Sequence, residues 1–209
     1  MTILRKQQKD RLRKAAIRGS RFYAHYLLDK AFIIVTEDYV AHSVTFKKAD
    51  FCHFTGLTIN HLTDIDFFDV CLKGTLRNIN LADVQHYNYS TLKTKANTLL
   101  KLDHFLHADS DVNLFLSGLT TNTFTFPCAI RNDNENMTMC FIGNDNHARS
   151  LRKARNSHNT LDEKRIVGIF ETADQKWNKC IYIKDRQEIQ KHFDPSLFTE
   201  SLKRYFRLI

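Results

Sequence analysis

The chain contains few of the residues that interrupt regular structure: six Gly and two Pro among 209 residues. Linkers between domains are usually rich in Gly, Pro and polar residues. The sequence shows no such linker, no internal repeat and no low-complexity segment. It therefore predicts a single compact domain, in which residues 1–30 form a basic helical N-terminal arm and residues 31–209 form the main body.

Long hydrophobic runs are also absent. No apolar run approaches the roughly 20 residues that a transmembrane helix needs. The N-terminus is basic, but it lacks the apolar segment that a secretory signal peptide requires. We therefore expect a soluble, cytoplasmic protein with no membrane partner.

Paired cysteines and the common catalytic motifs are missing as well. The five Cys are odd in number and widely spaced, which predicts reduced thiols rather than a zinc site or a disulfide framework. The chain has no GxxxxGK[ST], GxGxxG, HExxH or GxSxG motif. Asp64, Asp66 and Asp69 fit the polar face of one helix, so a metal-dependent nuclease is disfavoured. We expect neither a metal ion nor another cofactor.

Positive charge is abundant and concentrated. The formal net charge is +8; nine Lys or Arg lie within residues 1–30, and a second basic cluster spans residues 147–165. Charge gathered in this way indicates a polyanionic partner, and RNA is the leading candidate. The alternative is a solvated helical face that only aids solubility.

Hydrophobic periodicity predicts helices first and strands later. The expected elements are a helix over 4–29, a hairpin over 31–36 and 39–46, helices over 48–54, 64–72 and 91–107, strands over 112–116, 124–130, 137–142, 165–171 and 179–183, and a helix that begins at Asp194-Pro195. Gly56 and Gly74 are expected to end the two short helices. This order predicts the α+β class, with N-terminal helices packed on a curved antiparallel sheet.

Three short segments combine the residue types that metal-free RNA cleavage needs. In that reaction the RNA supplies its own nucleophile, the 2′-hydroxyl, and the protein supplies proton transfer and cations for the phosphorane. Histidine suits proton transfer because its ordinary pKa lies near neutral pH, and Lys and Arg suit the phosphate charge. The segments are FCHFTG at 51–56, CLKG at 71–74, and a basic turn, HARSLRK, at 147–153.

In their order, these segments resemble the phage-associated branch of the barnase–EndoU–colicin–RelE-like nucleases, the BECR-fold ribonuclease toxins, over roughly residues 20–190. The resemblance implies a BECR-like antiparallel sheet packed on helices and a metal-independent endoribonuclease. It implies that His53 transfers protons and that Lys73 and Lys153 stabilise the phosphate. Ser150 would lie beside the scissile phosphate.

The chain departs from that family at the basic turn. Members of the family usually have a Pro-Asn-Thr turn where this chain has Ala148-Arg149-Ser150, so Arg149 and Arg152 are expected to take over phosphate contacts there. His147 and His158 are the alternatives to His53 for proton transfer. The expected substrate-binding residues are Lys47, Lys48, Thr55, Arg149, Arg152 and Arg155.

Two classes of function follow from the sequence. The first is a ribonuclease that acts as a toxin or abortive-infection effector of a phage or mobile element, with RNA as substrate and an antitoxin, protein or RNA, as a second partner. The basic N-terminal helix is a candidate surface for an acidic antitoxin. The second is a non-catalytic nucleic-acid-binding regulator of a mobile element. A nuclease must gather its cations around one phosphate, whereas a binding protein would spread them over its surface.

Overall fold

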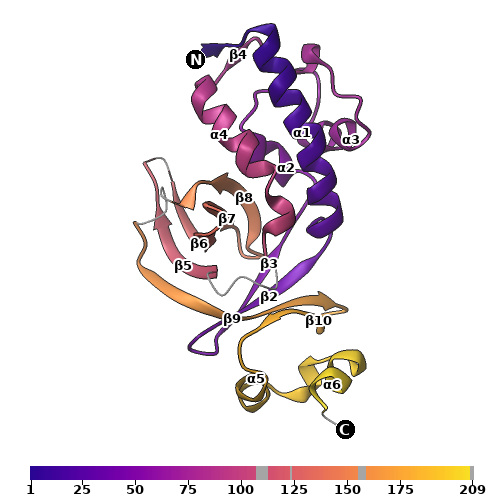
Figure 1. Cartoon of the computed structure of the whole chain (residues 1–209), viewed down its shortest axis with the longest axis vertical. Helices are drawn as coiled ribbons and strands as arrows, with labels where there is room; N and C mark the ends of the chain where they lie inside the picture. The colour runs from indigo at the N-terminus through magenta and orange to yellow at the C-terminus, as the bar shows by residue number, and fades with distance from the viewer. Residues whose placement is uncertain (107–112, 123, 155–158, 208–209) are drawn as a thin grey trace.

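The computed structural model describes residues 1–106, 113–122, 124–154 and 159–207. Its helices are α1 (Lys6–Tyr26), α2 (Asp50–Thr55), α3 (Asp64–Leu72), α4 (Tyr89–Leu99), α5 (Arg186–His192) and α6 (Glu200–Phe206), with short 3-10 turns at Asn78–Asn80, Leu102–His104 and Pro195–Leu197. Helices α1 to α4 gather at one end of the molecule, the large sheet lies in the middle, and α5 and α6 lie at the other end (Figure 1).

The large sheet is mixed but mostly antiparallel. Its strands are β2 (Ala31–Thr36), β3 (Ala41–Thr45), β5 (Asn113–Thr120), β6 (Thr125–Asn132), β7 (Met137–Ile142), β8 (His147–Arg152), β9 (Asp162–Ala173) and β10 (Lys176–Ile183), in the order β10-β9-β2-β3-β8-β7-β6-β5. A small separate sheet pairs β1 (Thr2–Ile3) with β4 (Val84–Gln85). The α+β class and the curved antiparallel sheet are confirmed, with one addition: β3 and β8 run parallel where Thr45 pairs with His147.

The sheet closes on itself because β9 is long. Its second half pairs with β2, and its first half pairs with β5 from Leu114↔Arg165 to Ser117↔Asp162. Seven strands thereby form a closed barrel, and β10 continues the sheet outside it. Closure leaves few unpaired edges and gives the helices a rigid surface to pack on.

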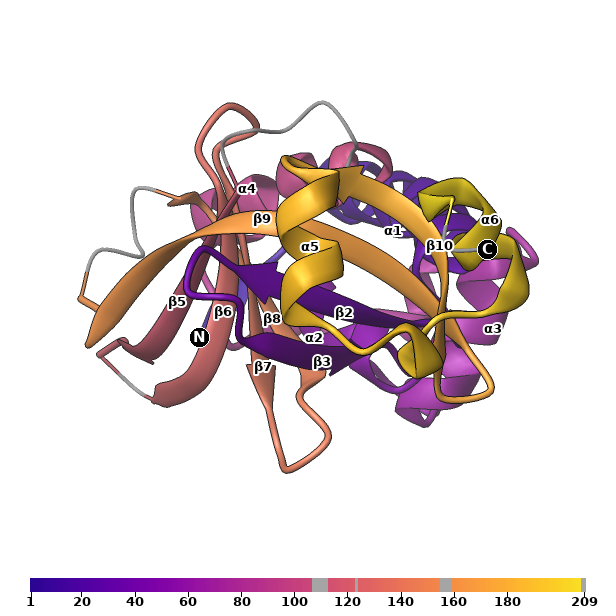
Figure 2. The same ribbon diagram turned by 90° about the horizontal axis from the view of Figure 1, so that it is seen from below.

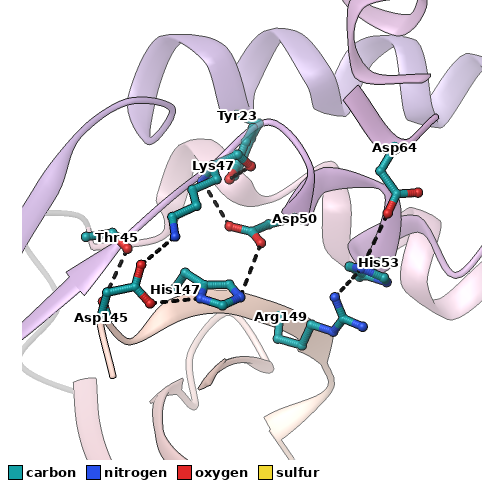
Figure 3. Close-up of polar contacts among 9 residues, drawn as sticks. All are labelled: Tyr23, Thr45, Lys47, Asp50, His53, Asp64, Asp145, His147 and Arg149. Atoms are coloured by element: carbon teal, nitrogen blue, oxygen red, sulfur yellow. Dashed lines mark hydrogen bonds and ion pairs between the residues drawn. The ribbon is translucent and has the colours of Figure 1, made fainter. Parts of the chain in front are cut away.

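Aromatic rings fill the core between the helices and the barrel. Tyr23 of α1 is fully buried, and its ring centroid lies 5.5–6.2 Å from those of four Phe rings, namely Phe46, Phe51, Phe54 and Phe68. The rings of Phe51 and Phe68 also contact each other, at 5.4 Å. The Tyr23 hydroxyl donates a hydrogen bond of 2.8 Å to the carbonyl of Lys47, just before α2. Because α1 anchors the entry to α2 in this way, His53, one turn later, is held in a fixed place (Figure 3).

A second, smaller core lies on the other face of the sheet. Helix α5 crosses the strands, and α6 lies beside β10 (Figure 2). Trp177, Phe198 and Phe206 are buried here against Phe170 of β9. This core covers the face of the sheet that α1 to α4 leave open.

The short helices end where the sequence predicts. Gly56 and Gly74 adopt positive φ angles of 66° and 74°, a left-handed conformation that favours glycine. Thr63 caps α3, since its side chain accepts the backbone N–H of Asp66. The boundaries of both helices depend on these local signals.

Other predictions of local structure were wrong. Residues 147–153, predicted as a turn, include strand β8, and the helix predicted to reach residue 107 ends at Leu99. Helix α5 was not predicted, and the last helix begins after Thr199 rather than at Pro195. Helix α1 buries Leu12, Ala16 and Tyr23 in the main core, while the division into an arm and a body at residue 30 stays a prediction. Within the residues that the structure describes, no helix is long and apolar enough to cross a membrane.

Candidate functional site

A cleft of about 510 Å³ opens between α2, α4, β8 and the loop that follows β4. Its polar lining consists of three cations (Lys95, Arg149 and Arg152), two imidazoles (His53 and His86), and the hydroxyl of Ser150. Its aromatic lining consists of Tyr87, Phe124 and Phe126. None of the described residues that line the cleft is acidic, so the cleft is suited to an anionic ligand.

His53 lies on the last turn of α2, where its imidazole is half-buried. Its Nε2 atom forms a hydrogen bond with a guanidinium nitrogen of Arg149 and lies 3.7 Å from a carboxylate oxygen of Asp64 (Figure 3). A guanidinium can only donate, so Nε2 must present a lone pair, and the imidazole is neutral. Burial lowers the pKa of His53, and the charge of Arg149 lowers it further. These features are those of a proton acceptor at neutral pH.

Lys95 lies on the buried face of α4, among Leu92, Ala96 and Leu99. Its ammonium donates to the carbonyl of Leu151 at 3.2 Å and, at 3.4 Å, to that of His53, so it links α2 to β8. Burial lowers the pKa of Lys95 to about 8, and the charge of Arg152 contributes to the shift. Among the described residues, no carboxylate forms an ion pair with this ammonium.

The glycine that ends α2 makes room for this lysine. A Cβ atom at Gly56 would lie 2.6 Å from Cδ of Lys95, closer than side chains approach. Gly56 also needs its positive φ angle. The FCHFTG segment therefore contributes to the cleft in two ways: it carries His53, and its Gly56 leaves space for the side chain of Lys95.

Arg152 and Ser150 enter the cleft from β8. The guanidinium of Arg152 lies 5.5 Å from the ring centroid of Phe126, and its buried Nε atom has no hydrogen-bond partner among the described residues. The pairing of β8 with β7 is irregular at Arg149, which lies between Ala148, paired with Phe141, and Ser150, paired with Cys140. Regular alternation is interrupted at this position, and both Arg149 and Ser150 line the cleft. The Arg152 guanidinium adds positive charge to the lining of the cleft, which suits an anionic ligand.

Lys153 lines a second groove of about 290 Å³ beside the cleft. The two share Tyr87, Lys95, Ser150 and Arg152 as lining residues. The second groove also has hydroxyl groups from α4, including those of Thr91 and Thr94. The pair of grooves is therefore continuous.

Four other predicted site residues, which the structure does describe, do not line this cleft: Lys47, Lys48, Thr55 and Lys73. Lys73 is exposed after α3, on the side where Gly74 approaches Arg21. Thr55 is buried, and its hydroxyl donates to the carbonyl of Cys52 at 2.8 Å, so it has a structural role at the end of α2. Lys47 pairs with Asp145, and Lys48 pairs with Asp69 at 3.1 Å. Arg155 and His158 lie outside the described residues.

His147 belongs to a separate polar cluster, formed with Asp145 and Asp50, that does not line the cleft. Its Nδ1 atom lies 2.9 Å from a carboxylate oxygen of Asp145, and its Nε2 atom lies 3.9 Å from Asp50 (Figure 3). Asp50 is buried, which raises its pKa, and it accepts the backbone N–H of Lys47 at 2.9 Å. This cluster ties the start of α2 to the start of β8.

Lys95, His86 and Tyr87 are among the cleft residues that were not found from the sequence. Lys95 had a usable signal, because a lysine three residues after Leu92 and four before Leu99 falls within the apolar stripe of a helix. His86 and Tyr87 follow the two-residue strand β4, where no periodic pattern exists. Their place depends on the pairing of β4 with the N-terminal strand β1.

Among the described residues, no group of three or more His, Cys, Asp or Glu side chains has an arrangement that could hold a metal ion. Comparison with curated proteins and with solved structures found no match. A family model matches residues 17–194, which is most of the chain. The chain belongs to the phage-Barnase-EndoU-ColicinE5/D-RelE like nuclease 4 family.

Proposed function

We propose that the protein is a metal-independent endoribonuclease that cleaves RNA by attack of a 2′-hydroxyl on the adjacent phosphate. Membership in a nuclease family supports a nucleic-acid substrate. One observation carries the proposal: the cleft gathers three cations and two imidazoles, and the part of its lining that the structure describes contains no acidic residue. Such a set can bind a phosphodiester and transfer protons at one place.

His53 is the proposed general base. When a phosphate enters, Arg149 exchanges its hydrogen bond to the imidazole for a bidentate contact with the phosphate oxygens, which frees the Nε2 lone pair. Nε2 then takes the proton of the 2′-hydroxyl as the new bond from the 2′-oxygen to phosphorus forms. The bond from phosphorus to the 5′-oxygen breaks, which leaves a 2′,3′-cyclic phosphate. His86, the second imidazole of the cleft, is the candidate donor of a proton to the leaving oxygen.

The cations have separate proposed tasks. Lys95 and Arg152 stabilise the extra charge of the phosphorane, since both are partly desolvated and electrostatic interactions are stronger in such a site. Ser150 donates to a phosphate oxygen, and Lys153 contacts the flanking phosphate from the second groove. Lys73, which the sequence suggested for the phosphorane, is replaced in this role by Lys95.

The proposed biological role is that of a toxin or abortive-infection effector. The phage association in the description of the family supports this role. A ribonuclease of this kind needs control in its own cell, so we propose an antitoxin as its second partner. Induction of the protein in cells tests the role: growth arrest with RNA fragmentation is expected, and normal growth with intact RNA would contradict it.

The test of the enzymatic proposal is His53→Ala, measured by cleavage, RNA affinity and a thermal melt. Loss of a proton-transfer group should lower the cleavage rate by about 10²–10⁴-fold. RNA affinity should change little, because affinity comes mostly from phosphate contacts. Exposed His25→Ala is the matched control. If the His53 variant melts normally and cuts RNA at the parent rate, His86 or His147 becomes the candidate; if the parent binds RNA but cuts none, the protein is a non-catalytic regulator.

A further inference from the structure

The cleft has an aromatic part that phosphate chemistry does not use. Tyr87 and Phe124 line it, and their side chains are 46% and 50% exposed. Most aromatic side chains are buried in a core, away from water. Aromatic rings that stay exposed along a charged cleft therefore indicate a ligand-binding site. Phe126, mostly buried, supports Phe124 with ring centroids 4.9 Å apart.

Each ring system lies next to a cation proposed to bind phosphate. The Lys95 ammonium is 5.7 Å from the centroid of Tyr87, and the Arg152 guanidinium is 5.5 Å from that of Phe126. A nucleotide presents the same pair of features, a flat base and an anionic phosphate joined by one sugar. The cleft thus matches one nucleotide in chemistry and, at about 510 Å³, in size.

We infer that this cleft holds an unpaired nucleobase against Tyr87 and Phe124, so that the substrate is single-stranded RNA that enters with one base turned out of its stack. Aromatic side chains bind bases by stacking, and every base has a face to offer. A base within an A-form duplex is covered by its neighbours and cannot reach such a ring. Duplex RNA is therefore excluded unless it opens locally.

The adjacent groove indicates where the RNA strand continues beyond the cleft. It continues from the cleft past Tyr87 and Lys95. Its described lining offers Lys153 together with hydroxyl groups of α4, and no aromatic ring besides Tyr87. Cations and hydroxyls suit the sugar-phosphate backbone rather than a base. We therefore expect one base of the RNA to lie in the aromatic cleft and the next phosphate along the strand to lie beside Lys153.

This inference deepens the proposed function, but its test does not need catalysis. The probe is a single-stranded 2′-fluoro RNA, which lacks the attacking hydroxyl. It carries the fluorescent base 2-aminopurine at one internal position between two uracils, which stack on it only weakly and leave the free probe bright. Stacking of 2-aminopurine on an aromatic ring quenches its emission. The parent protein is expected to quench the probe, and a matched duplex is expected to bind at least tenfold more weakly.

Two variants locate the effect. Tyr87→Ala and Phe124→Ala should each weaken binding of the probe by about 5- to 100-fold and relieve quenching, whereas Tyr87→Phe should keep both. Tyr26→Ala is the control, because Tyr26 is 42% exposed but lies outside the cleft. Lys153→Ala should weaken binding and flatten its salt dependence without changing the quenching at saturation, and Lys93→Ala on the outer face of α4 should do neither.

Three outcomes would overturn the inference: no binding of the probe, equal affinity for single strand and duplex, or normal quenching in both aromatic variants. A different result would contradict the proposed function alone: the parent quenches the probe, but natural RNA stays intact with the parent as it does with His53→Ala. Cleavage of RNA that depends on His53 but not on Tyr87 or Phe124 would leave the nuclease proposal standing and remove the base site.

Discussion

The buried lysine of the cleft gives a prediction about stability that is independent of any RNA assay. Replacing Lys95 by Met keeps the length of an apolar stem against Gly56 and Tyr87 and removes the ammonium. Because burial lowers the pKa of Lys95 from 10.5 to about 8, the charged form is less favourable in the folded protein than in the unfolded chain. The parent therefore pays a penalty for its charge that the variant avoids.

The size of this penalty depends on pH. Below pH 8 both folded and unfolded chains carry the proton, and the full shift costs about 3 kcal/mol at pH 7. Between pH 8 and 10.5 the unfolded chain binds more protons than the folded protein, so the stability of the parent rises with pH, and at pH 10 the penalty falls below about 1 kcal/mol. The variant also loses two hydrogen bonds, to the carbonyls of His53 and Leu151, which offset its gain by about 1 kcal/mol each at every pH.

Urea unfolding of both proteins at pH 7 and pH 10 measures the effect. The unfolding free energy of the Met variant minus that of the parent should be about 2–3 kcal/mol lower at pH 10 than at pH 7. The reason is that the charge penalty, which only the parent carries, is smaller at pH 10. For a chain of this size, the difference amounts to about 5–10 °C in the thermal midpoint. The matched control is Lys93→Met on the exposed face of the same helix.

A difference between Lys95→Met and parent that stays constant from pH 7 to pH 10 would refute the reasoning, since it would mean that the ammonium is well hydrated. A second readout is the stabilisation of each protein by 2′-fluoro RNA at pH 7. RNA should raise the midpoint of the parent more than that of the Met variant, because a bound phosphate supplies the anion that Lys95 lacks.

Three further predictions follow from the site and its supports. RNA cleavage should persist in EDTA, and complete loss that Mg²⁺ or Mn²⁺ restores would contradict a metal-independent mechanism. Arg149→Ala should lower the cleavage rate and move the acid limb of its pH profile to higher pH, because the charge of Arg149 lowers the pKa of His53; an unmoved limb would separate the two residues. Thr63→Ala should cost about 1 kcal/mol of stability in a thermal melt through the lost cap of α3, with cleavage per folded molecule unchanged.

Local patterns were sufficient to predict much of the fold. The predicted range of α3 was correct because the residues that determine its ends, Thr63 and Gly74, are its neighbours in the sequence. The β2–β3 hairpin was predicted from two short apolar runs. Strand β8 was mistaken for a turn because its sequence, HARSLR, is basic and lacks alternating apolar residues. Its strand conformation comes from pairing with β7 and, at His147, with β3.

The sequence alone determined the chemistry available to this protein: an excess of positive charge, a histidine beside a helix-ending glycine, and a late basic segment. Only the tertiary structure decided which of these residues meet. Parallel pairing of β8 with β3, the strand before α2, brings β8 against α2 and α4. This joins His53 to Arg149 and places Lys95 in the cleft while leaving Lys73 outside. The physical reason is that such contacts join residues about 40 to 100 positions apart, and their geometry depends on the packing of the whole core rather than on any local pattern.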